Sequence, residues 1–440
     1  MPEPRGSVVH QPKRCAKERV RLLLLGLAVV DVQDRVVAAL RDAGLSDVQA
    51  RLSIAPVHQV IPHSVLAEIE AFVRLFDRIT TREAWQTTVT VDAAEVARVA
   101  RPETCFFSAW DFHVPPDRPS EWQLVEFNDN GSGFLLAALL NRHHFELGNV
   151  AQRGSIEAPA SYDSFAAKLL AMIRAEGEAF FGEPLHGPVL ILDDRESMQV
   201  GRFRQELVLL QRICRAAGWI SEIASPSETK WDGKCLFHDD TPIRFVVNRS
   251  TDFLWEGEEF SAVRAAYESR SVYVAPNPFT YSTRSDKRLL EWLSTQVRDS
   301  EVGILPEERK FLGAHVPETR LLREENVDEL VSQRDSLFFK PCHGFASHGL
   351  LPGARVGRTR LRRLLKKGHA YVAQRSAPKS RLSTSDGVEL WVDLRVWAYR
   401  GERFLLSGRA SRKPDGLDLS PPGGWLATYA ESLPNRDDER

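Results

Sequence analysis

The sequence predicts a mixed α/β protein of the α+β kind, and two observations lead to this fold class. In the middle of the chain, short apolar runs such as PVLILDD (188–194) alternate with amphipathic stretches such as RFRQELVLLQRICRAAG (202–218), as strands and helices do in βαβ units. Towards the C-terminus, β-rich apolar runs follow one another, and Arg400–Glu402 separates two of them as a hairpin loop would. We therefore expect both a parallel and an antiparallel sheet.

Composition and charge exclude several classes of protein. The chain has 440 residues and a net charge of −2, so no overall basic field favours nucleic acid or a membrane surface. Its five cysteines are far apart and form no CxxC pair, which argues against a zinc knuckle or a disulfide framework and for a reducing compartment. The apolar run Leu22–Val30 follows basic residues as in a signal peptide, but Asp31 ends it and it is too short to span a bilayer. We expect a buried segment there, and a cytoplasmic protein without a membrane or nucleic-acid partner.

The changes in sequence pattern divide the chain at about residues 100, 185, 285 and 430. Residues 1–100 are predicted to be mostly helical, because VVAALRDAGL (36–45) and VLAEIEAFVRLF (65–76) carry apolar residues at a spacing of three to four. Residues 101–185 follow, and two extended segments are expected within 105–130 around a proline-rich turn.

The second half of the chain is expected to contain the two sheets. Residues 186–285 predict a mostly parallel sheet. Residues 286–430 predict an antiparallel sheet with a flanking helix at RTRLRRLLKKG (358–368), and residues 431–440 a loose tail. Seven basic residues and no acid lie between Arg355 and Lys367. This is the pattern of a solvated helix face with leucines turned inward, and the alternative is a surface that docks an acidic partner. The antiparallel sheet is expected from four runs: SLFFKP (336–341), AYVAQR (370–375), ELWVDLRVWAYRG (389–401) and RFLLSGRA (403–410).

The stretch LVEFNDNGSG (124–133) presents oxygen ligands at the end of a predicted strand. Glu126 and Asn128 are two residues apart, so they share one face of a strand. If Asp111 in the preceding AWDFH lies on the neighbouring strand, three oxygen donors can converge, as Mg²⁺ requires. The alternative is a turn rich in Asn and Asp with a chance carboxylate.

Two lysines lie where they could bind phosphate. Lys340 ends an apolar run, and the loop after it contains Gly344, Ser347 and Gly349, whose backbone N–H groups could form an anion-binding concavity. It is not a P-loop, because leucines stand where that motif needs Lys and Ser or Thr. Lys287 precedes a predicted helix, and a helix entry also favours anions. The alternatives are a structural loop for Lys340 and a surface lysine for Lys287.

Two arginines near the C-terminus, Arg395 and Arg409, could also bind an anion. Strand alternation places Asp393 and Arg395 on one face, and Arg409 follows after the hairpin. Guanidinium groups bind phosphate or carboxylate through a planar fork. The alternative is a structural ion pair with Asp393.

Six segments, in this order, resemble the ATP-grasp enzymes over about residues 100–430. The resemblance is closest to the circularly permuted group that includes glutathionylspermidine synthetase and its uncharacterised bacterial relatives. It implies a circularly permuted ATP-grasp fold, with a helical N-terminal region and a Rossmann-like pre-ATP-grasp domain at residues 186–285. The segments are DFHVPPDRPSEWQLVEFNDNGSG, VVNRSTDF, APNPFTYSTRSDKRLL, LFFKPCHGFASHGL, YVAQR and GRASR…PPGGWLATY.

The resemblance also implies roles for individual residues. Asp111, Glu126 and Asn128 match magnesium ligands, and Lys287 and Lys340 match lysines that hold nucleotide phosphates. The loop with Gly344, Ser347 and Gly349 matches the loop that closes over the triphosphate, and Val372, Ala373 and Gln374 match the strand that reads adenine. Arg395 and Arg409 would face the reacting phosphate or acyl group. Ala109 stands where the synthetase has an arginine, and His348 where the bacterial relatives tend to carry a lysine.

The resemblance implies an ATP-dependent carboxylate–amine ligase that uses ATP and Mg²⁺ and forms an amide through an acyl phosphate. Its partners would be a small-molecule or peptide carboxylate and an amine. Two alternatives come from other classes of protein. One is a nucleotide-binding protein without ligase turnover. The other is a structural or nucleic-acid-binding protein that uses the basic face between Arg355 and Lys367.

Overall fold

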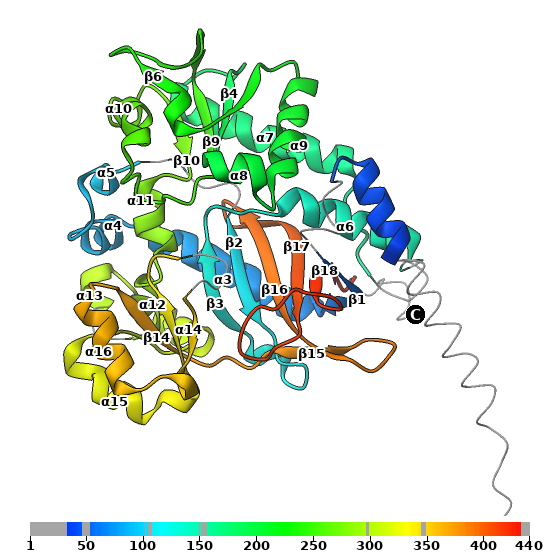
Figure 1. Cartoon of the computed structure of the whole chain (residues 1–440), viewed down its shortest axis with the longest axis vertical. Helices are drawn as coiled ribbons and strands as arrows, with labels where there is room; N and C mark the ends of the chain where they lie inside the picture. Colours follow the sequence, from blue (N-terminus) through cyan, green and yellow to red (C-terminus); the bar gives the residue numbers. More distant parts are fainter. Residues whose placement is uncertain are drawn as a thin grey trace, which may run out of the picture.

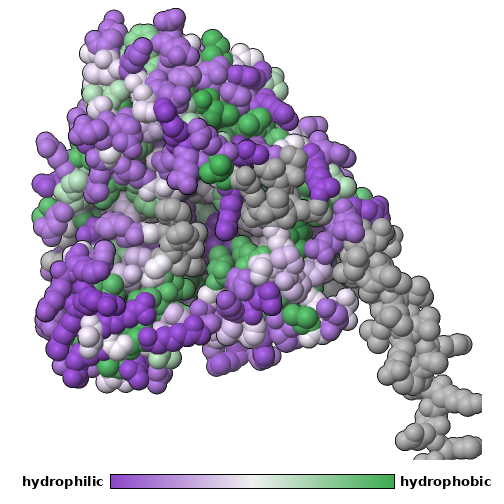
Figure 2. Space-filling model, viewed as in Figure 1, coloured by the Kyte–Doolittle hydropathy of each residue, from purple (hydrophilic) through white to green (hydrophobic). Residues whose placement is uncertain are grey.

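The computed structural model describes residues 33–45, 53–101, 103, 108–148, 150, 156–295, 299–344 and 349–432. A central sheet lies between a unit built on a parallel sheet and a smaller unit built on an antiparallel sheet (Figure 1). In the face seen in Figure 2, hydrophilic side chains predominate and hydrophobic ones interrupt them in small patches. In the part of the chain that the structure describes, no helix is long and apolar enough to cross a membrane.

The central sheet joins strands from three distant parts of the sequence. Its order is β1-β18-β17-β16-β2-β3, with β15 paired to β16. The pairs are antiparallel except for β1 with β18, which is parallel. The strands are β1 (Ile54–Ile61), β2 (Ala109–His113), β3 (Gln123–Asn128), β15 (Ser380–Ser383), β16 (Glu389–Tyr399), β17 (Glu402–Ser411) and β18 (Gly424–Ala430).

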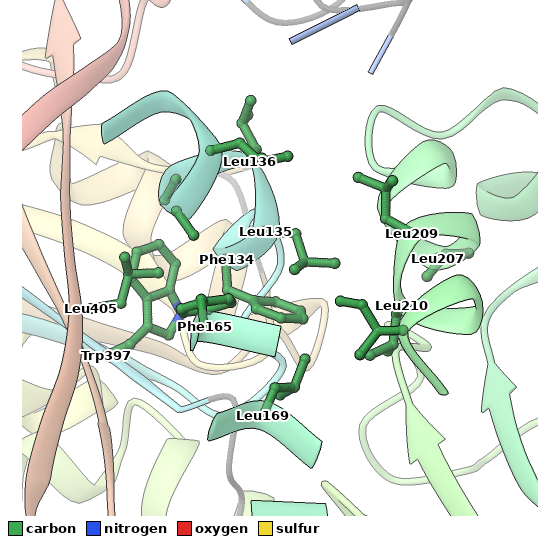
Figure 3. Close-up of a cluster of buried hydrophobic side chains, with 14 of the residues drawn as sticks. Phe134, Leu135, Leu136, Phe165, Leu169, Leu207, Leu209, Leu210, Trp397 and Leu405 are labelled. Atoms are coloured by element: carbon green, nitrogen blue, oxygen red, sulfur yellow. The ribbon is translucent and has the colours of Figure 1, made fainter. Parts of the chain in front are cut away.

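Helices cover both faces of the central sheet, but one face only in part. Alternation along β16 sends Leu394 and Val396 to the face packed on α3 (His63–Thr80). Trp397 points to the other face, where α6 (Phe134–Leu147) packs. Figure 3 shows the first turn of α6 between Trp397 and Leu405 of the sheet and the leucines of α9 (Arg204–Ala216). Further along β16, the same face carries Asp393 and Arg395 beside a cavity rather than under a helix.

The parallel sheet expected within residues 186–285 is confirmed. Its order is β10-β9-β4-β5 and its three pairs are parallel. Apolar residues cover both faces, with α7 (Tyr162–Phe181) and α9 on one side and α10 (Ser261–Glu268) on the other. Its strands are β4 (Val189–Leu192), β5 (Ser221–Ala224), β9 (Phe245–Asn248) and β10 (Tyr273–Ala275). An antiparallel sheet accompanies it, made of β6 (Thr229–Trp231), β7 (Leu236–His238) and β8 (Thr241–Ile243).

The third unit contains the antiparallel sheet β11-β14-β12-β13, which packs on α15 (Val327–Ser332) and α16 (Arg358–Lys366). Leu361 of α16 is buried in this core, whereas Arg358 and Arg362 pair with acids of the preceding segment. The basic helix is therefore a solvated face with its leucine inward, as the first interpretation predicted. The strands are β11 (Thr319–Leu321), β12 (Leu337–Pro341), β13 (Leu351–Pro352) and β14 (Tyr371–Arg375).

One strand was not expected from the sequence, and one expectation about the elements is wrong. Strand β1 lies within residues 1–100, which were expected to be mostly helical; its pairing with β18, as in Ile54 with Trp425, is a long-range contact that local periodicity does not reveal. The four β-rich runs of residues 286–430 do not form one sheet, because β12 and β14 pair together while β16 and β17 join the central sheet. The hairpin at Arg400–Glu402 is confirmed, with Arg400 and Gly401 at φ of 48° and 79°. The expected buried segment at Leu22–Val30 lies outside the described residues.

Candidate functional site

A cavity of about 360 Å³ lies between the central sheet and the β11–β14 sheet. We call it the central cavity. Strands β2, β3, β16 and β17 supply one wall, and β12 and β14 supply the other. It is therefore built from the part of the central sheet that α6 leaves uncovered.

Oxygen donors line the wall formed by β2 and β3. These strands are antiparallel, and Asp111 is the cross-strand partner of Glu126. Asn128 lies two residues further along β3, opposite Ala109, and also lines the cavity. The expectation that Asp111 lies on the strand beside Glu126 is therefore confirmed.

Asp111 is held by two arginines. Arg395 donates from Nε and Nη2 to the two carboxylate oxygens at 2.5 and 2.7 Å, and Arg409 donates from Nη2 to Oδ2 at 2.9 Å. Burial alone would raise the pKa of Asp111, but these guanidinium groups lower it to about 2. Arg409 also pairs with Asp393 at 2.7 Å. Asp111 is thus charged at any physiological pH, and the ion pair predicted as an alternative role for Asp393 is present.

The two predicted lysines face the same cavity. Lys287 Nζ lies 2.9 Å from Glu126 Oε1 and donates to the Gly344 carbonyl oxygen at 2.7 Å. Burial opposes ionisation of Glu126, but Lys287 and Lys340 lower its pKa below the ordinary value. Lys340 Nζ donates to Gln374 Oε1 at 2.5 Å and to the Val125 carbonyl oxygen at 3.2 Å. Burial lowers the pKa of Lys340 to about 8.

The donor set on β2 and β3 fits Mg²⁺. Two carboxylates and one carboxamide offer hard oxygens on one face, and water and phosphate oxygens would complete an octahedron. Asp111 retains acceptor capacity beside its arginines, because each carboxylate oxygen has two lone pairs. Within the described residues, no group of three or more His, Cys, Asp or Glu side chains could hold a metal ion, so the set needs the Asn128 amide as its third donor.

The remaining predicted residues differ in their relation to this cavity. Gly344 and Gln374 line it, as do Arg395 and Arg409. Gly349 adopts a φ of 76°, accepts a hydrogen bond from the Tyr371 hydroxyl, and is not among the residues that line the cavity. Val372 and Ala373 are buried within β14 and do not line it either. Ser347 and His348 lie outside the described residues.

Sequence reasoning missed several titratable groups of the central cavity, among them His113 and Lys379. His113 follows Asp111 by two residues on β2, so strand alternation could have revealed it. Its Nδ1 lies 2.8 Å from the Ala377 carbonyl oxygen, and burial, aided by Lys379, lowers its pKa to about 4. Lys379 donates to the Gly416 carbonyl oxygen at 3.1 Å, and burial lowers its pKa as well. Lys379 lies between β14 and β15, in a segment without a distinctive sequence pattern, so the sequence carries no signal for it.

One of the glycines after Asn128, Gly133, is required by close packing. Gly133 precedes α6 with a φ of 95°, and a Cβ there would meet the Trp425 ring at 2.3 Å. Glu206 accepts hydrogen bonds from the backbone N–H of Gly133 and Leu135 at 2.9 and 3.1 Å, which caps the helix from the parallel-sheet unit. The Asn130 amide donates to the Arg249 carbonyl oxygen at 2.8 Å. The turn that follows β3 is thereby fixed to the neighbouring unit.

Comparisons with known proteins agree with this architecture at the level of the fold. No family model matches the sequence, and no curated protein matches it. Among solved structures, the chain is similar to a glutathione synthetase-like effector from Globodera pallida. The two share 11% identity over 93% of this chain and 97% of that one, with a TM-score of 0.56.

Two further structures are similar at lower TM-scores. A putative γ-glutamylcysteine synthetase from Methylobacillus flagellatus KT shares 10% identity, covering 84% of this chain and 89% of its own, with a TM-score of 0.46. The ATP-grasp ligase PsnB shares 14% identity, covering 58% of this chain and 93% of its own, with a TM-score of 0.28. These two scores are too low to carry an argument. The first likeness shows the fold alone, which is similar to that of the glutathione synthetase-like effector.

Proposed function

We propose that this chain is an ATP-dependent ligase that joins a carboxylate to an amine. One observation carries the proposal: two ammonium groups and a set of oxygen donors, from segments far apart in the sequence, line the same cavity. Lys287 and Lys340 suit the phosphates of ATP, and Asp111, Glu126 and Asn128 suit Mg²⁺. The substrates would be a small-molecule or peptide carboxylate and an amine.

The proposed reaction has two steps. A carboxylate oxygen attacks the γ-phosphorus of ATP, the bond to the bridging oxygen breaks, and ADP leaves an acyl phosphate behind. The amine nitrogen then attacks the acyl carbon, inorganic phosphate departs, and the nitrogen loses a proton as the amide forms. Bound Mg²⁺ would neutralise phosphate charge. Lys287 and Lys340 would hold the phosphates in line, and Arg395 and Arg409 would stabilise charge on the transferring group.

The present partners of the two lysines support a mechanism in which the phosphates of ATP replace these partners. Lys287 bonds Glu126, and Lys340 bonds Gln374. A triphosphate would attract both ammonium groups more strongly than these partners do, because it carries several negative charges. Glu126 would then be free to face the metal. The predicted roles of Val372, Ala373 and Gln374 in reading adenine, and of the loop with Ser347 in covering the phosphates, belong to the same proposal.

One observation favours a second candidate, a nucleotide-binding protein without ligase turnover. Both carboxylate oxygens of Asp111 already accept hydrogen bonds from arginine, so a metal ion would have to share them. Ala109, opposite Asn128, also stands where the synthetase carries an arginine. Such a protein would bind ATP and release no ADP.

The decisive experiment measures ADP release on adding pairs of candidate carboxylates and amines. We expect release that depends on both substrates, and a rate about 10²–10³ lower in Lys340→Ala. Lys310→Ala is the matched control, because Lys310 is exposed on α14 (Pro306–His315) outside the cavity. An unchanged rate in Lys340→Ala would end the phosphate assignment, and ATP binding without ADP release would favour the second candidate.

A further inference from the structure

A second cavity, of about 370 Å³, lies where the N-terminal helices meet the segment that precedes Lys287. Its walls come from the end of α3, from α4 (Glu83–Val89), and from α11 (Pro278–Thr280) with the π-helical turn Tyr281–Ser285. Ala100, Arg101 and Glu103 complete them. It shares no lining residue with the central cavity. Its volume is near the lower end of the range for small-molecule sites, about 300–1,000 Å³.

Two opposite charges line this second cavity without a hydrogen-bond partner among the described residues. Arg101 and Glu103 are each only 5% exposed. Among the residues that the structure describes, Nε, Nη1 and Nη2 of Arg101 and both carboxylate oxygens of Glu103 are buried without a hydrogen-bond partner. Buried ionisable groups are normally paired, since an unpaired charge in the interior is costly. Such a pair of unsatisfied groups, one a donor and one an acceptor, indicates that a ligand supplies the missing partners.

The guanidinium group of Arg101 lies over an aromatic ring. Its Cζ lies 4.2 Å from the centre of the Tyr267 ring. A cation over an aromatic face keeps the N–H donors at its edge available for a planar acceptor such as a carboxylate. The other arginine of the cavity, Arg284, pairs through Nη2 with Asp77 at 2.5 Å, and its Nε is buried without a hydrogen-bond partner among the described residues. Arg101 is therefore the group that an incoming anion would meet.

We propose that the second cavity binds a small zwitterion of the α-amino-acid class, with its carboxylate on Arg101 and its ammonium group on Glu103. A simple anion would leave the Glu103 carboxylate unpaired, and a simple cation would leave Arg101 unpaired. A molecule with both groups satisfies both. The threonines and Gln86 of the wall offer further polar contacts, and Phe279 offers an apolar one. The ligand would touch Thr283 and Arg284, which lie on the turn that leads to Lys287.

The experiment measures thermal unfolding and calorimetric binding of the full chain with each proteinogenic amino acid. Acetate, methylamine and inorganic phosphate serve as probes that carry a single charged group. We expect at least one amino acid to raise the unfolding temperature in a saturable way and to bind more tightly than any of the single-group probes. The proposal is overturned if no amino acid does so, or if acetate or phosphate alone reproduces the whole shift.

Variants locate the binding. Arg101→Met and Glu103→Gln each remove an unpaired charge, so we expect them to fold and to weaken amino-acid affinity about 10- to 100-fold. Arg98→Met is the matched control, because Arg98 is exposed and donates to the Ala93 carbonyl oxygen. Lys340→Ala, in the central cavity, should retain the amino-acid shift. If Arg101→Met fails to fold, Glu103→Gln carries the test, and full affinity in Glu103→Gln contradicts the proposal.

Discussion

The two cavities differ in whether their buried charged side chains have hydrogen-bond partners within the protein. In the central cavity the principal charges have partners inside the protein: Asp111 bonds Arg395 and Arg409, and Glu126 bonds Lys287. In the second cavity, Arg101 and Glu103 have no hydrogen-bond partner among the described residues. A ligand of the central cavity must therefore replace internal partners, whereas a ligand of the second cavity would supply partners that are missing.

This difference distinguishes charged residues that stabilise the fold from charged residues that would bind a ligand. The Asp111 carboxylate fastens β2 to β16 and β17, because its two arginines belong to those strands. Its charge therefore contributes to the central sheet whether or not a metal ion is bound. Arg101 and Glu103 have no hydrogen-bond partner among the described residues, and keeping them buried costs free energy until a ligand binds.

The largest expected effect comes from breaking the pair at Asp111. Asp111→Ala leaves Arg395 buried without its carboxylate, so we expect a loss of about 3–5 kcal/mol in the free energy of unfolding. Arg101→Met, which removes a charge that has no partner, should lose none. Urea denaturation of the two variants measures the contrast.

A control and a double variant sharpen this prediction. Asp117→Ala changes an exposed aspartate in the turn after the same strand and should leave stability nearly unchanged. Asp111→Ala combined with Arg395→Met should recover part of the loss, because no unpaired guanidinium group then remains at that position. A loss at Asp111 of only about 0–1 kcal/mol, as for a surface pair, would contradict the assignment of a stabilising buried pair.

Local pattern predicts which residues face the central cavity, but not how they pair. Alternation on one strand predicts that Glu126 and Asn128 share a face, whereas Asp111 joins them only on the condition that its segment forms the neighbouring strand. The arginines that hold Asp111 are 284 and 298 residues away in the chain, and local periodicity does not specify contacts at that distance. The same limit hid β1, whose partner β18 lies near the other end of the chain.

The second cavity could not be predicted for a different reason. Arg101 and Glu103 stand in RPE, which has the appearance of ordinary surface charge. Charged residues are mostly exposed, so composition argues against burial there. Their burial follows from tertiary packing between α4, α11 and the end of α3, which no short pattern encodes.

A smaller effect is expected at the proposed metal ligands of the central cavity. Glu126→Gln keeps the shape and one oxygen but removes the charge that a divalent cation favours. We expect the Mg²⁺ concentration that supports half-maximal ATP binding to rise at least about tenfold, the loss that even an outer-shell partner can cause. Calorimetry at a series of Mg²⁺ concentrations measures it. Glu121→Gln, an exposed glutamate just before β3, is the control; a wild-type magnesium titration in Glu126→Gln would count against the ligand assignment.

The smallest effect concerns pH and separates Lys340 from the other charges of the central cavity. Burial lowers the pKa of Lys340 to about 8, below the ordinary value of about 10.4. Below pH 8 the ammonium group is present and can bind phosphate. Above pH 8 it loses its proton, so ATP binding must take one up. Affinity for ATP should therefore fall up to about tenfold per pH unit as the pH rises through 8 towards about 10.

Lys340→Arg tests this assignment, because a guanidinium group stays charged throughout this range. We expect the affinity of Lys340→Arg for ATP to change little between about pH 7 and pH 10, even if the arginine binds less tightly at neutral pH. Lys310→Arg, on the exposed face of α14, should reproduce the wild-type decline. If Lys340→Arg declines as the wild type does, the group that titrates is not Lys340, and the phosphate contact must be assigned to another residue of the cavity. If the decline disappears only in Lys340→Arg, the buried ammonium group is the one that the triphosphate draws away from Gln374.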